Sequence, residues 1–236
     1  MAGDYEDCKM GAYRRVGETP GVELSGEATG LVPDPTWKAA MFNTPADVAA
    51  HNDQWYLGDT YHVAIGQGYL LVTPLQVNAW TNVIASGGKL CRPTIEKVTG
   101  GKGDCKDIGA KAETIKLIAT GMQEACATGG TGWPLFDFGV TRDTNGVATS
   151  SGTLTGIPVA CKTGTAEFGD PQNRTHAWFT TFAPVLDTDV APEDKKGPTL
   201  TGDPELSITV LVEGAGEGSN VAAPVAKKIY EEWFTR

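Results

Sequence analysis

The sequence has 236 residues, of which 40% are hydrophobic, so it can fold around a core and is not a disordered tail. Its 19 lysines and arginines against 29 aspartates and glutamates give a formal net charge of −10, which argues against a nucleic-acid partner, because such binding depends on basic surface. It contains neither an apolar run of membrane-spanning length nor a signal peptide, so we expect a cytoplasmic protein or one whose export or anchor segment lies outside this sequence.

The first third of the chain predicts loops followed by one well-marked helix. Residues 1–36 are rich in Gly, Glu and Pro and show weak periodicity, and residues 37–72 are mixed. A helix then begins at Thr73, the expected N-cap, with a proline in its first turn and Gln76 completing a capping box. A pair of glycines ends it. Its apolar residues lie on most sides and predict a buried helix: Leu75, Val77, Ala79, Trp80, Val83 and Ile84.

The middle of the chain predicts one strand and one amphipathic helix. Residues 89–99 have the composition of a strand, and residues 111–127 that of a helix. Apolar side chains recur at helical spacing in the second segment, at Ile115, Ile118, Met122 and Cys126. Residues 128–156 are rich in Gly, Thr and Ser, so we expect a long surface excursion there.

The last third predicts a sheet and a covering helix. Alternating segments mark three strands, at residues 157–167, 175–183 and 206–213. A charged, proline-bearing loop over residues 187–203 separates the second strand from the third. Ser219 or Asn220 is the expected cap of a final helix, whose predicted apolar stripe is Val221, Val225, Ile229 and Trp233. Strands followed by a covering helix predict an α+β fold with an antiparallel sheet covered by helices, and nothing requires two domains.

The cysteines and histidines predict no metal site. The five cysteines (Cys8, Cys91, Cys105, Cys126 and Cys161) form no C-x-x-C pair, and the histidines (His51, His62 and His176) are isolated. Cys91 and Cys105 flank a glycine-rich turn, where a disulfide suited to an oxidising compartment and a pair of free thiols are equally consistent with the sequence. Cys161 precedes Lys162 on a strand, so it faces the packed side and is expected to fill the core.

A glycine-rich segment before the final helix raises the possibility of a nucleotide site. Gly214-Ala215-Gly216-Glu217-Gly218-Ser219 follows a strand and precedes a helix, as a dinucleotide-binding fingerprint does. However, serine occupies the position of the third glycine, and no second βαβ unit follows. We therefore predict a tight strand-to-helix turn and no cofactor.

Lys162-Thr163-Gly164-Thr165 is the motif with the most chemical content. Lysine-threonine-glycine is one of three signatures of serine penicillin-recognising enzymes, beside S-x-x-K and S-D-N, although the string alone also occurs by chance in an ordinary edge strand. Gly164 leaves space for a second backbone, and an edge strand can bind an extended peptide by strand addition. The motif therefore predicts a strand that binds a peptide carboxylate.

Other segments, in the same order, resemble class B penicillin-binding proteins of the penicillin-binding protein 2 type, over roughly residues 20–236. Beside the K-T-G strand, the matching segments are Val22-Glu23-Leu24-Ser25-Gly26-Glu27-Ala28-Thr29-Gly30, Gly66-Gln67-Gly68 with Thr73-Pro74-Leu75-Gln76, His176-Ala177-Trp178-Phe179 and Val221-Ala222-Ala223-Pro224. The resemblance implies a serine β-lactamase/transpeptidase-like fold. It also implies a peptidoglycan D,D-transpeptidase that cross-links the cell wall and maintains cell shape by acyl transfer through a serine ester, without cofactor or metal.

The resemblance further implies site roles and partners. Lys162 would supply positive charge at the proton relay and at the substrate carboxylate, and Thr163 would face away or make a minor contact. Gly164 would leave room for substrate, while Thr165 would bind the carboxylate and donate its backbone N–H to the oxyanion. Implied partners are the peptidoglycan stem peptide, β-lactams and a glycosyltransferase of the elongation machinery, on the extracytoplasmic face of the bacterial inner membrane.

The other two catalytic motifs are not found in this sequence. The single S-x-x-K, Ser86-Gly87-Gly88-Lys89, lies at a predicted helix end, and no serine precedes an asparagine by two positions. We therefore predict that residues 1–236 are the C-terminal portion of a transpeptidase domain, without its nucleophile, and that the chain alone is not acylated. A D,D-carboxypeptidase relative, or a non-catalytic module that binds or senses penicillin or wall peptide, is the alternative.

Overall fold

The computed structural model describes residues 19–97, 103–185 and 202–236. The chain divides into two compact units, Met1–Gln76 and Val77–Arg236, and each is described by itself. Of the loop expected over residues 187–203, only the last two residues fall among those described. In the described part of the chain, no helix is long and apolar enough to cross a membrane.

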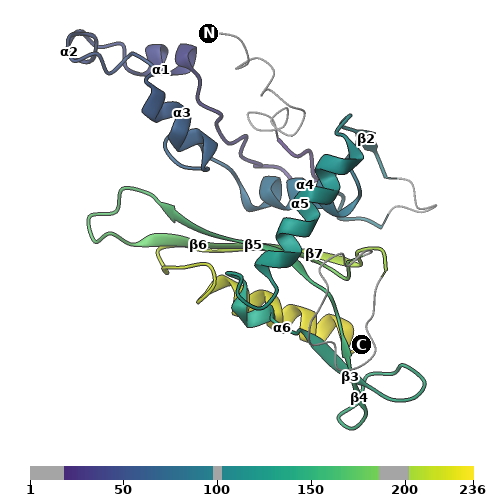
Figure 1. The fold of residues 1–236 in the computed structure, drawn as a ribbon. Helices are drawn as coiled ribbons and strands as arrows, with labels where there is room; N and C mark the ends of the chain where they lie inside the picture. Colours follow the sequence, from purple (N-terminus) through teal and green to yellow (C-terminus); the bar gives the residue numbers. More distant parts are fainter. Residues whose placement is uncertain (1–18, 98–102, 186–201) are drawn as a thin grey trace. The chain divides into compact units, whose positions relative to one another are not determined.

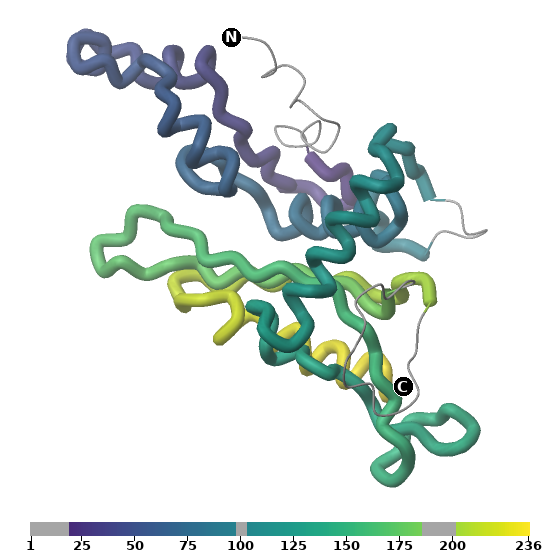
Figure 2. The backbone as a smooth tube through the Cα atoms, viewed as in Figure 1, coloured from purple at the N-terminus to yellow at the C-terminus, as the bar shows by residue number. Residues whose placement is uncertain are grey.

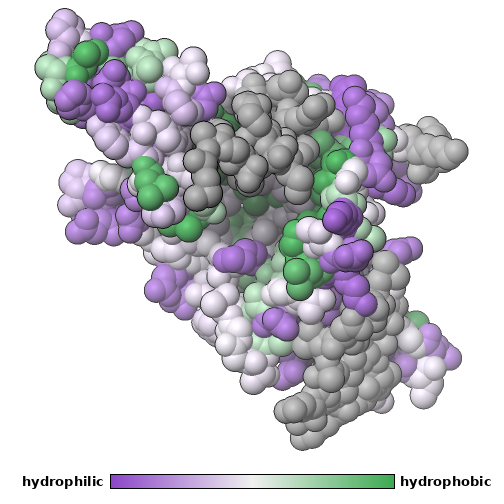
Figure 3. Space-filling model, turned by 45° about the horizontal axis from the view of Figure 1, so that its top comes forward, coloured by the Kyte–Doolittle hydropathy of each residue, from purple (hydrophilic) through white to green (hydrophobic). Residues whose placement is uncertain are grey.

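The N-terminal unit contains three short helices, α1 (Pro35–Met41), α2 (Pro45–Ala49) and α3 (Leu57–Ala64). Asp34 caps α1 by accepting the Trp37 backbone N–H at 2.7 Å, and Thr44 caps α2 in the same way. Both α1 and α2 have a proline in the first turn. Residues 37–72, which the sequence describes only as mixed, are thus about half helical. Some apolar side chains of this unit are exposed, such as Met41 and Val48. Figure 3 shows hydrophobic and hydrophilic residues interspersed on the surface of the molecule.

Two distant segments of the N-terminal unit meet at Gly30. Leu31 and Leu71 form an antiparallel bridge, and the Gln76 side-chain amide donates to the Thr29 carbonyl at 2.9 Å. Gly30 has a φ of +67°, and a Cβ there would lie 2.5 Å from the Leu71 carbonyl oxygen. Only glycine combines this backbone conformation with this close approach.

Helix α4 (Pro74–Ala85) begins as the sequence predicts. The Thr73 N–H donates to Gln76 Oε1 at 2.8 Å, and the Gln76 N–H donates to Thr73 Oγ1 at 3.1 Å, which confirms the capping box. Burial is less complete than expected, because Val83 is the one apolar α4 residue that is fully buried. Two polar residues, Gln76 and Thr81, are buried instead.

A short hairpin and a second long helix follow α4. Strands β1 (Lys89–Cys91) and β2 (Cys105–Asp107) pair antiparallel, so the strand expected over residues 89–99 is shorter than predicted. A disulfide joins Cys91 to Cys105 across this hairpin, which settles the alternative that the sequence leaves open. Helix α5 (Ala112–Ala125) agrees with the predicted helix to within two residues at each end.

The main sheet has three antiparallel strands, in the order β5 (Ala160–Glu167), β6 (Thr175–Ala183) and β7 (Leu206–Val212). Figure 1 shows α5 and α6 (Ala222–Phe234) on opposite sides of this sheet, and Figure 2 follows the β5–β6 hairpin in green. Ala160 and Phe182 pack with residues of α4 and α5, whereas Cys161 and Phe179 pack on the α6 side. The predicted antiparallel sheet covered by helices is confirmed.

The helix face that α6 buries differs from the predicted one. The expected stripe residues Val225, Ile229 and Trp233 are 42%, 41% and 38% exposed. The core side is instead formed by Ala222, Ala223, Ala226, Tyr230 and Phe234. Small alanine side chains let the helix lie close to the sheet. The predicted N-cap is also wrong, because Val221 occupies that position and makes no side-chain capping bond.

Residues 128–156 are not the surface excursion that their composition predicts. They contain the 3-10 helix η2 (Trp133–Leu135) and the antiparallel strands β3 (Gly139–Arg142) and β4 (Thr153–Gly156). Leu135, Phe138 and Val140 lie buried in the largest hydrophobic core, with Tyr230 and Phe234 of α6. A few large apolar residues therefore anchor a segment whose other residues are small and polar.

Candidate active site

The K-T-G residues lie on β5, which forms one edge of the sheet and has β6 as its one strand neighbour in the described part of the chain. Successive residues of a strand face opposite sides. Lys162 and Gly164 therefore share the face toward α4, and Thr163 and Thr165 share the face toward α6. The structure brings all four predicted site residues together on one exposed strand.

Lys162 has an exposed side chain whose Nζ donates to the Thr163 carbonyl oxygen at 2.5 Å. Across the sheet it pairs with Thr180, which in turn pairs with Thr209 of β7. The Thr180 hydroxyl lies 2.6 Å from that of Thr81 on α4 and 2.8 Å from that of Thr209. A row of hydroxyls thus extends from the lysine strand to α4 and β7, on the face that carries the Lys162 amine.

Thr163 lies on the other face and binds a loop. Its hydroxyl donates to Oγ1 of Thr131 at 2.9 Å, just beyond the C-terminus of α5. The preceding residue, Cys161, is fully buried and forms a disulfide with Cys126. The prediction that Cys161 faces inward and fills the core is confirmed, whereas its disulfide with Cys126 was not predicted. The sequence offers no signal for this pairing, because 35 positions separate the two cysteines.

Two close approaches explain the glycines around this strand. A Cβ on Gly164 would lie 3.1 Å from Cβ of Trp178, its partner on β6. A Cβ on Gly218 would lie 2.0 Å from the Trp178 carbonyl oxygen and 2.7 Å from that of Gly164. The glycine-rich segment before α6 therefore packs on the centre of the β5–β6 pair. Its glycines are explained by backbone packing, in agreement with the predicted strand-to-helix turn.

Side-chain contacts order the end of the β5–β6 hairpin. The rings of Phe168 and His176 stack with centroids 4.0 Å apart, and the Gly214 N–H donates to His176 Nδ1 at 3.1 Å. In the turn, Arg174 donates two hydrogen bonds to the carboxylate of Asp170, at 3.1 and 2.7 Å. The Arg174 guanidinium holds the pKa of Asp170 well below its usual range. The hairpin end is thus held by contacts within its own turn and by one hydrogen bond from the segment that follows β7.

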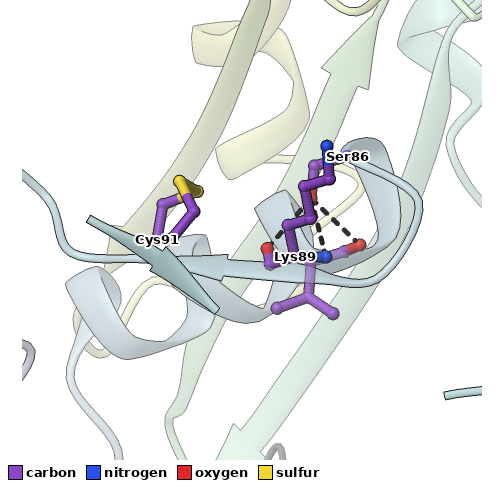
Figure 4. Close-up of a disulfide and its surroundings, with 5 residues drawn as sticks. Ser86, Lys89 and Cys91 are labelled. Carbon is purple, nitrogen blue, oxygen red and sulfur yellow. Dashed lines mark hydrogen bonds between the residues drawn. A yellow bond between two sulfur atoms is a disulfide. The ribbon is translucent and has the colours of Figure 1, made fainter. Parts of the chain in front are cut away.

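Ser86 and Lys89 do not have the geometry of a catalytic serine and lysine. Figure 4 shows the Ser86 hydroxyl bonded to nearby backbone: Oγ donates to the Lys89 carbonyl oxygen at 2.9 Å and accepts the Lys89 N–H at 3.2 Å. A nucleophilic serine needs a base at its hydroxyl, and here that position is taken by main-chain groups. Ser86 lies between the end of α4 and the start of β1, and its hydroxyl links the two through backbone hydrogen bonds, which is a structural role.

The described residues contain no group of three or more His, Cys, Asp or Glu side chains that could hold a metal ion. His51 contacts Gln54, and His176 contacts the Gly214 backbone. The chemistry available at β5 is therefore that of a lysine ammonium, hydroxyls and backbone groups along a sheet edge. Such groups bind a carboxylate and an extended peptide.

The family model for the penicillin binding protein transpeptidase domain matches residues 13–192. The chain belongs to this family. The match extends beyond β6, so it includes the K-T-G strand and its partner β6.

Relatives of known type agree with this assignment. The chain is 28% identical to the peptidoglycan D,D-transpeptidase MrdA of Haemophilus influenzae, over 93% of this chain and 31% of that protein. It resembles penicillin-binding protein 2 in a complex with MreC from Helicobacter pylori (TM-score 0.63, 32% identity, 92% of this chain and 34% of that one). It also resembles a chain of a peptidoglycan synthase complex that coordinates polymerization and crosslinking (TM-score 0.65, 29% identity, 94% and 32%).

These comparisons confirm the predicted class B transpeptidase of the penicillin-binding protein 2 type and its β-lactamase/transpeptidase-like fold. The chain spans about a third of the length of the relatives it matches. The roles of Lys162, Thr163, Gly164 and Thr165, and the placement of residues 1–236 at the end of a transpeptidase domain, stay predictions.

Proposed function

We propose that this chain supplies the K-T-G side of the active site of a peptidoglycan D,D-transpeptidase. The observation that carries the proposal is the position of Lys162-Thr163-Gly164-Thr165 on an exposed edge strand of a transpeptidase-family sheet. A stem peptide adds to this edge by strand addition, with its terminal carboxylate beside the Thr165 hydroxyl, while Lys162 supplies positive charge from the other face of the same edge. The Thr165 backbone N–H serves as one oxyanion donor.

The attacking serine is proposed to lie outside residues 1–236. In support, the Ser86 hydroxyl forms its hydrogen bonds with main-chain groups of Val83 and Lys89. The complete protein then performs two acyl transfers. The serine oxygen bonds to the penultimate D-alanine carbonyl carbon as the terminal D-alanine leaves, and an amine of a second stem peptide releases the serine.

The cellular setting is proposed from the relatives and the cysteines. Structures similar to this chain include a complex with MreC and a synthase that joins polymerization to crosslinking, which supports a glycosyltransferase partner in the elongation machinery. Two disulfides support an oxidising compartment, such as the extracytoplasmic face of the inner membrane.

The test is labelling by a fluorescent penicillin, followed by intact mass measurement. Residues 1–236 alone should show no adduct, and a stoichiometric adduct on Ser86 would overturn the assignment of the nucleophile. In the complete protein, Lys162→Ala should slow acylation by about 100-fold, because a charged group at the transition state is lost. The matched control is Lys89→Ala, which removes another exposed lysine of the same unit and should leave the rate unchanged. Equal rates for the two variants would refute the proposed role of β5.

A further inference from the structure

The segment that follows α5 holds the K-T-G strand at two points, one on each side of Lys162. Cys126 is joined to Cys161 by a disulfide, and the Thr131 hydroxyl accepts the hydrogen bond of Thr163. Residues 161 and 163 face the α6 side of the sheet, whereas Lys162 between them faces the α4 side. Both attachments therefore fix the strand without occupying the face that carries the amine.

The segment that provides these attachments is itself fixed. The Gly132 N–H donates to the Ala125 carbonyl at 2.7 Å, which closes the turn after α5. A Cβ on Gly132 would lie 2.5 Å from Cys161 Sγ and 2.7 Å from Cys126 Sγ, so the turn is packed directly on the disulfide. Three residues further on, Leu135 is 1% exposed in the core. The turn is thus held in place by a hydrogen bond, by packing on the disulfide and by a buried anchor in the core.

The need for such a support follows from the topology. An interior strand is held on both edges by hydrogen bonds to its neighbours, but β5 has a strand neighbour on one edge in the described part of the chain. A ligand that binds along the outer edge gains from a strand whose position is already set, because ordering the strand during binding costs free energy. The two attachments supply this order from one face of the sheet.

We propose that the Cys126–Cys161 disulfide and the Thr131 hydroxyl are positioning groups for Lys162 and the K-T-G edge, and this rests on the function proposed above for that strand. They touch no reacting atom. They act by holding residues 161 and 163, and thereby the direction in which the amine and the backbone of β5 point. Loss of this one cross-link loosens the K-T-G strand while leaving residues 162–165 unchanged.

The first experiment measures hydrogen exchange over residues 160–167 of the complete protein under non-reducing conditions. The paired substitution Cys126→Ser/Cys161→Ser should raise the exchange rate of this strand by about tenfold, in proportion to the more frequent local opening. The matched control is Cys91→Ser/Cys105→Ser, which removes the other disulfide of the same unit and should leave the strand unchanged. Equal exchange in the two paired variants overturns the proposal.

The second experiment follows acylation by a fluorescent penicillin and does not depend on the cysteines. Thr131→Val removes the hydroxyl that Thr163 binds and should slow acylation about threefold, the effect of one exposed hydrogen bond. Thr131→Ser keeps the hydroxyl and should restore the rate, which a purely steric role would not require. The proposal is also overturned if the variants exchange hydrogen faster over residues 160–167 but are acylated at the parent rate, or if Thr131→Ser does not restore the acylation rate.

Lys162→Ala separates this inference from the proposed function. If Lys162→Ala leaves acylation unchanged, the function proposed for β5 fails, and with it the reason for positioning Lys162, whatever the exchange data show. If Lys162→Ala slows acylation while the Thr131 and Cys126/Cys161 variants change neither exchange nor rate, the function stands and the positioning role is refuted.

Discussion

Replacing Gly218 by alanine places a methyl carbon against two backbone carbonyls of the K-T-G hairpin. The new Cβ would start 2.0 Å from the Trp178 carbonyl oxygen and 2.7 Å from that of Gly164, whereas real Cβ atoms essentially never come within 3.0 Å. The segment before α6 must therefore move by at least about 1 Å, and the obstacle is backbone, which cannot rotate away. Overpacking of this kind costs about 1–3 kcal/mol, and a backbone obstacle places Gly218→Ala near 3 kcal/mol.

Thermal unfolding followed by circular dichroism measures this cost. For a chain of 150–250 residues, 1 kcal/mol corresponds to about 2–4 °C, so we expect the midpoint of Gly218→Ala to fall by roughly 6–12 °C. Gly121→Ala is the matched control, since a Cβ there meets nothing within 4 Å and the site is an exposed position of α5. It should raise stability by about 1 kcal/mol through helix propensity. A Gly218→Ala midpoint equal to that of the parent protein would refute the packing argument.

Three further predictions concern buried polar groups. Tyr230→Phe removes a hydroxyl that donates to Thr181 Oγ1 at 3.2 Å and should lower the free energy of unfolding by about 1 kcal/mol in urea titrations; no change would show that the bond contributes nothing. Burial raises the pKa of Tyr230 far above its usual 10. The stabilisation that the protonated hydroxyl gives the folded state is therefore complete below pH 10 and is lost as the pH rises further. The parent protein should consequently lose stability above pH 10 more steeply than Tyr230→Phe. Asp59→Asn leaves the buried Lys38 ammonium without its carboxylate partner at 2.7 Å and should lower the free energy of unfolding by about 3 kcal/mol. Asp170→Asn, at a pair whose arginine is exposed, should cost clearly less, and similar losses in the two variants would contradict this ranking.

The Asp59 prediction depends on which effect controls that carboxyl group. Burial alone would raise the pKa of Asp59, but hydrogen bonds from Lys38 and from the Tyr56 backbone outweigh it, and the pKa is lowered overall. The ionised pair is therefore the folded form. The contribution of this ion pair to the free energy of unfolding is present above the ordinary aspartate pKa, and it is lost as the pH falls below that pKa.

Local signals in the sequence predict local structure well. The predicted strand over residues 175–183 has the bounds of β6, and the capping box at Thr73 and Gln76 forms as expected. Both depend on neighbouring residues, through alternation in one case and a three-residue spacing in the other. The same type of signal is present at Asp34-Pro35 and Thr44-Pro45, a cap followed by a first-turn proline, and it could have located α1 and α2.

Packing choices were harder to predict, because they depend on surfaces far away in the chain. Counting apolar residues on α6 selects Val225, Ile229 and Trp233, yet the helix turns its alanines and Tyr230 to the sheet. Side-chain size decides which face of α6 is buried, because alanines allow the helix to lie close to the sheet. A count of hydrophobic positions does not include this effect. Likewise, Leu135 and Phe138 enter the core from a segment whose composition indicates a surface loop.

The candidate site shows the same division between local and distant determinants. The four motif residues are contiguous, so the sequence identifies them at once, but their supports come from other parts of the chain. A strand that is to bind a ligand along its outer edge cannot also be paired there with a permanent neighbour, so its position has to be fixed from its faces. Cys126, Thr131 and Gly218 meet that requirement with a disulfide, a hydroxyl and the absence of a side chain, none of which produces a periodic pattern. Sequence motifs thus locate the proposed binding edge, whereas the residues that hold it in place become visible only in the folded chain.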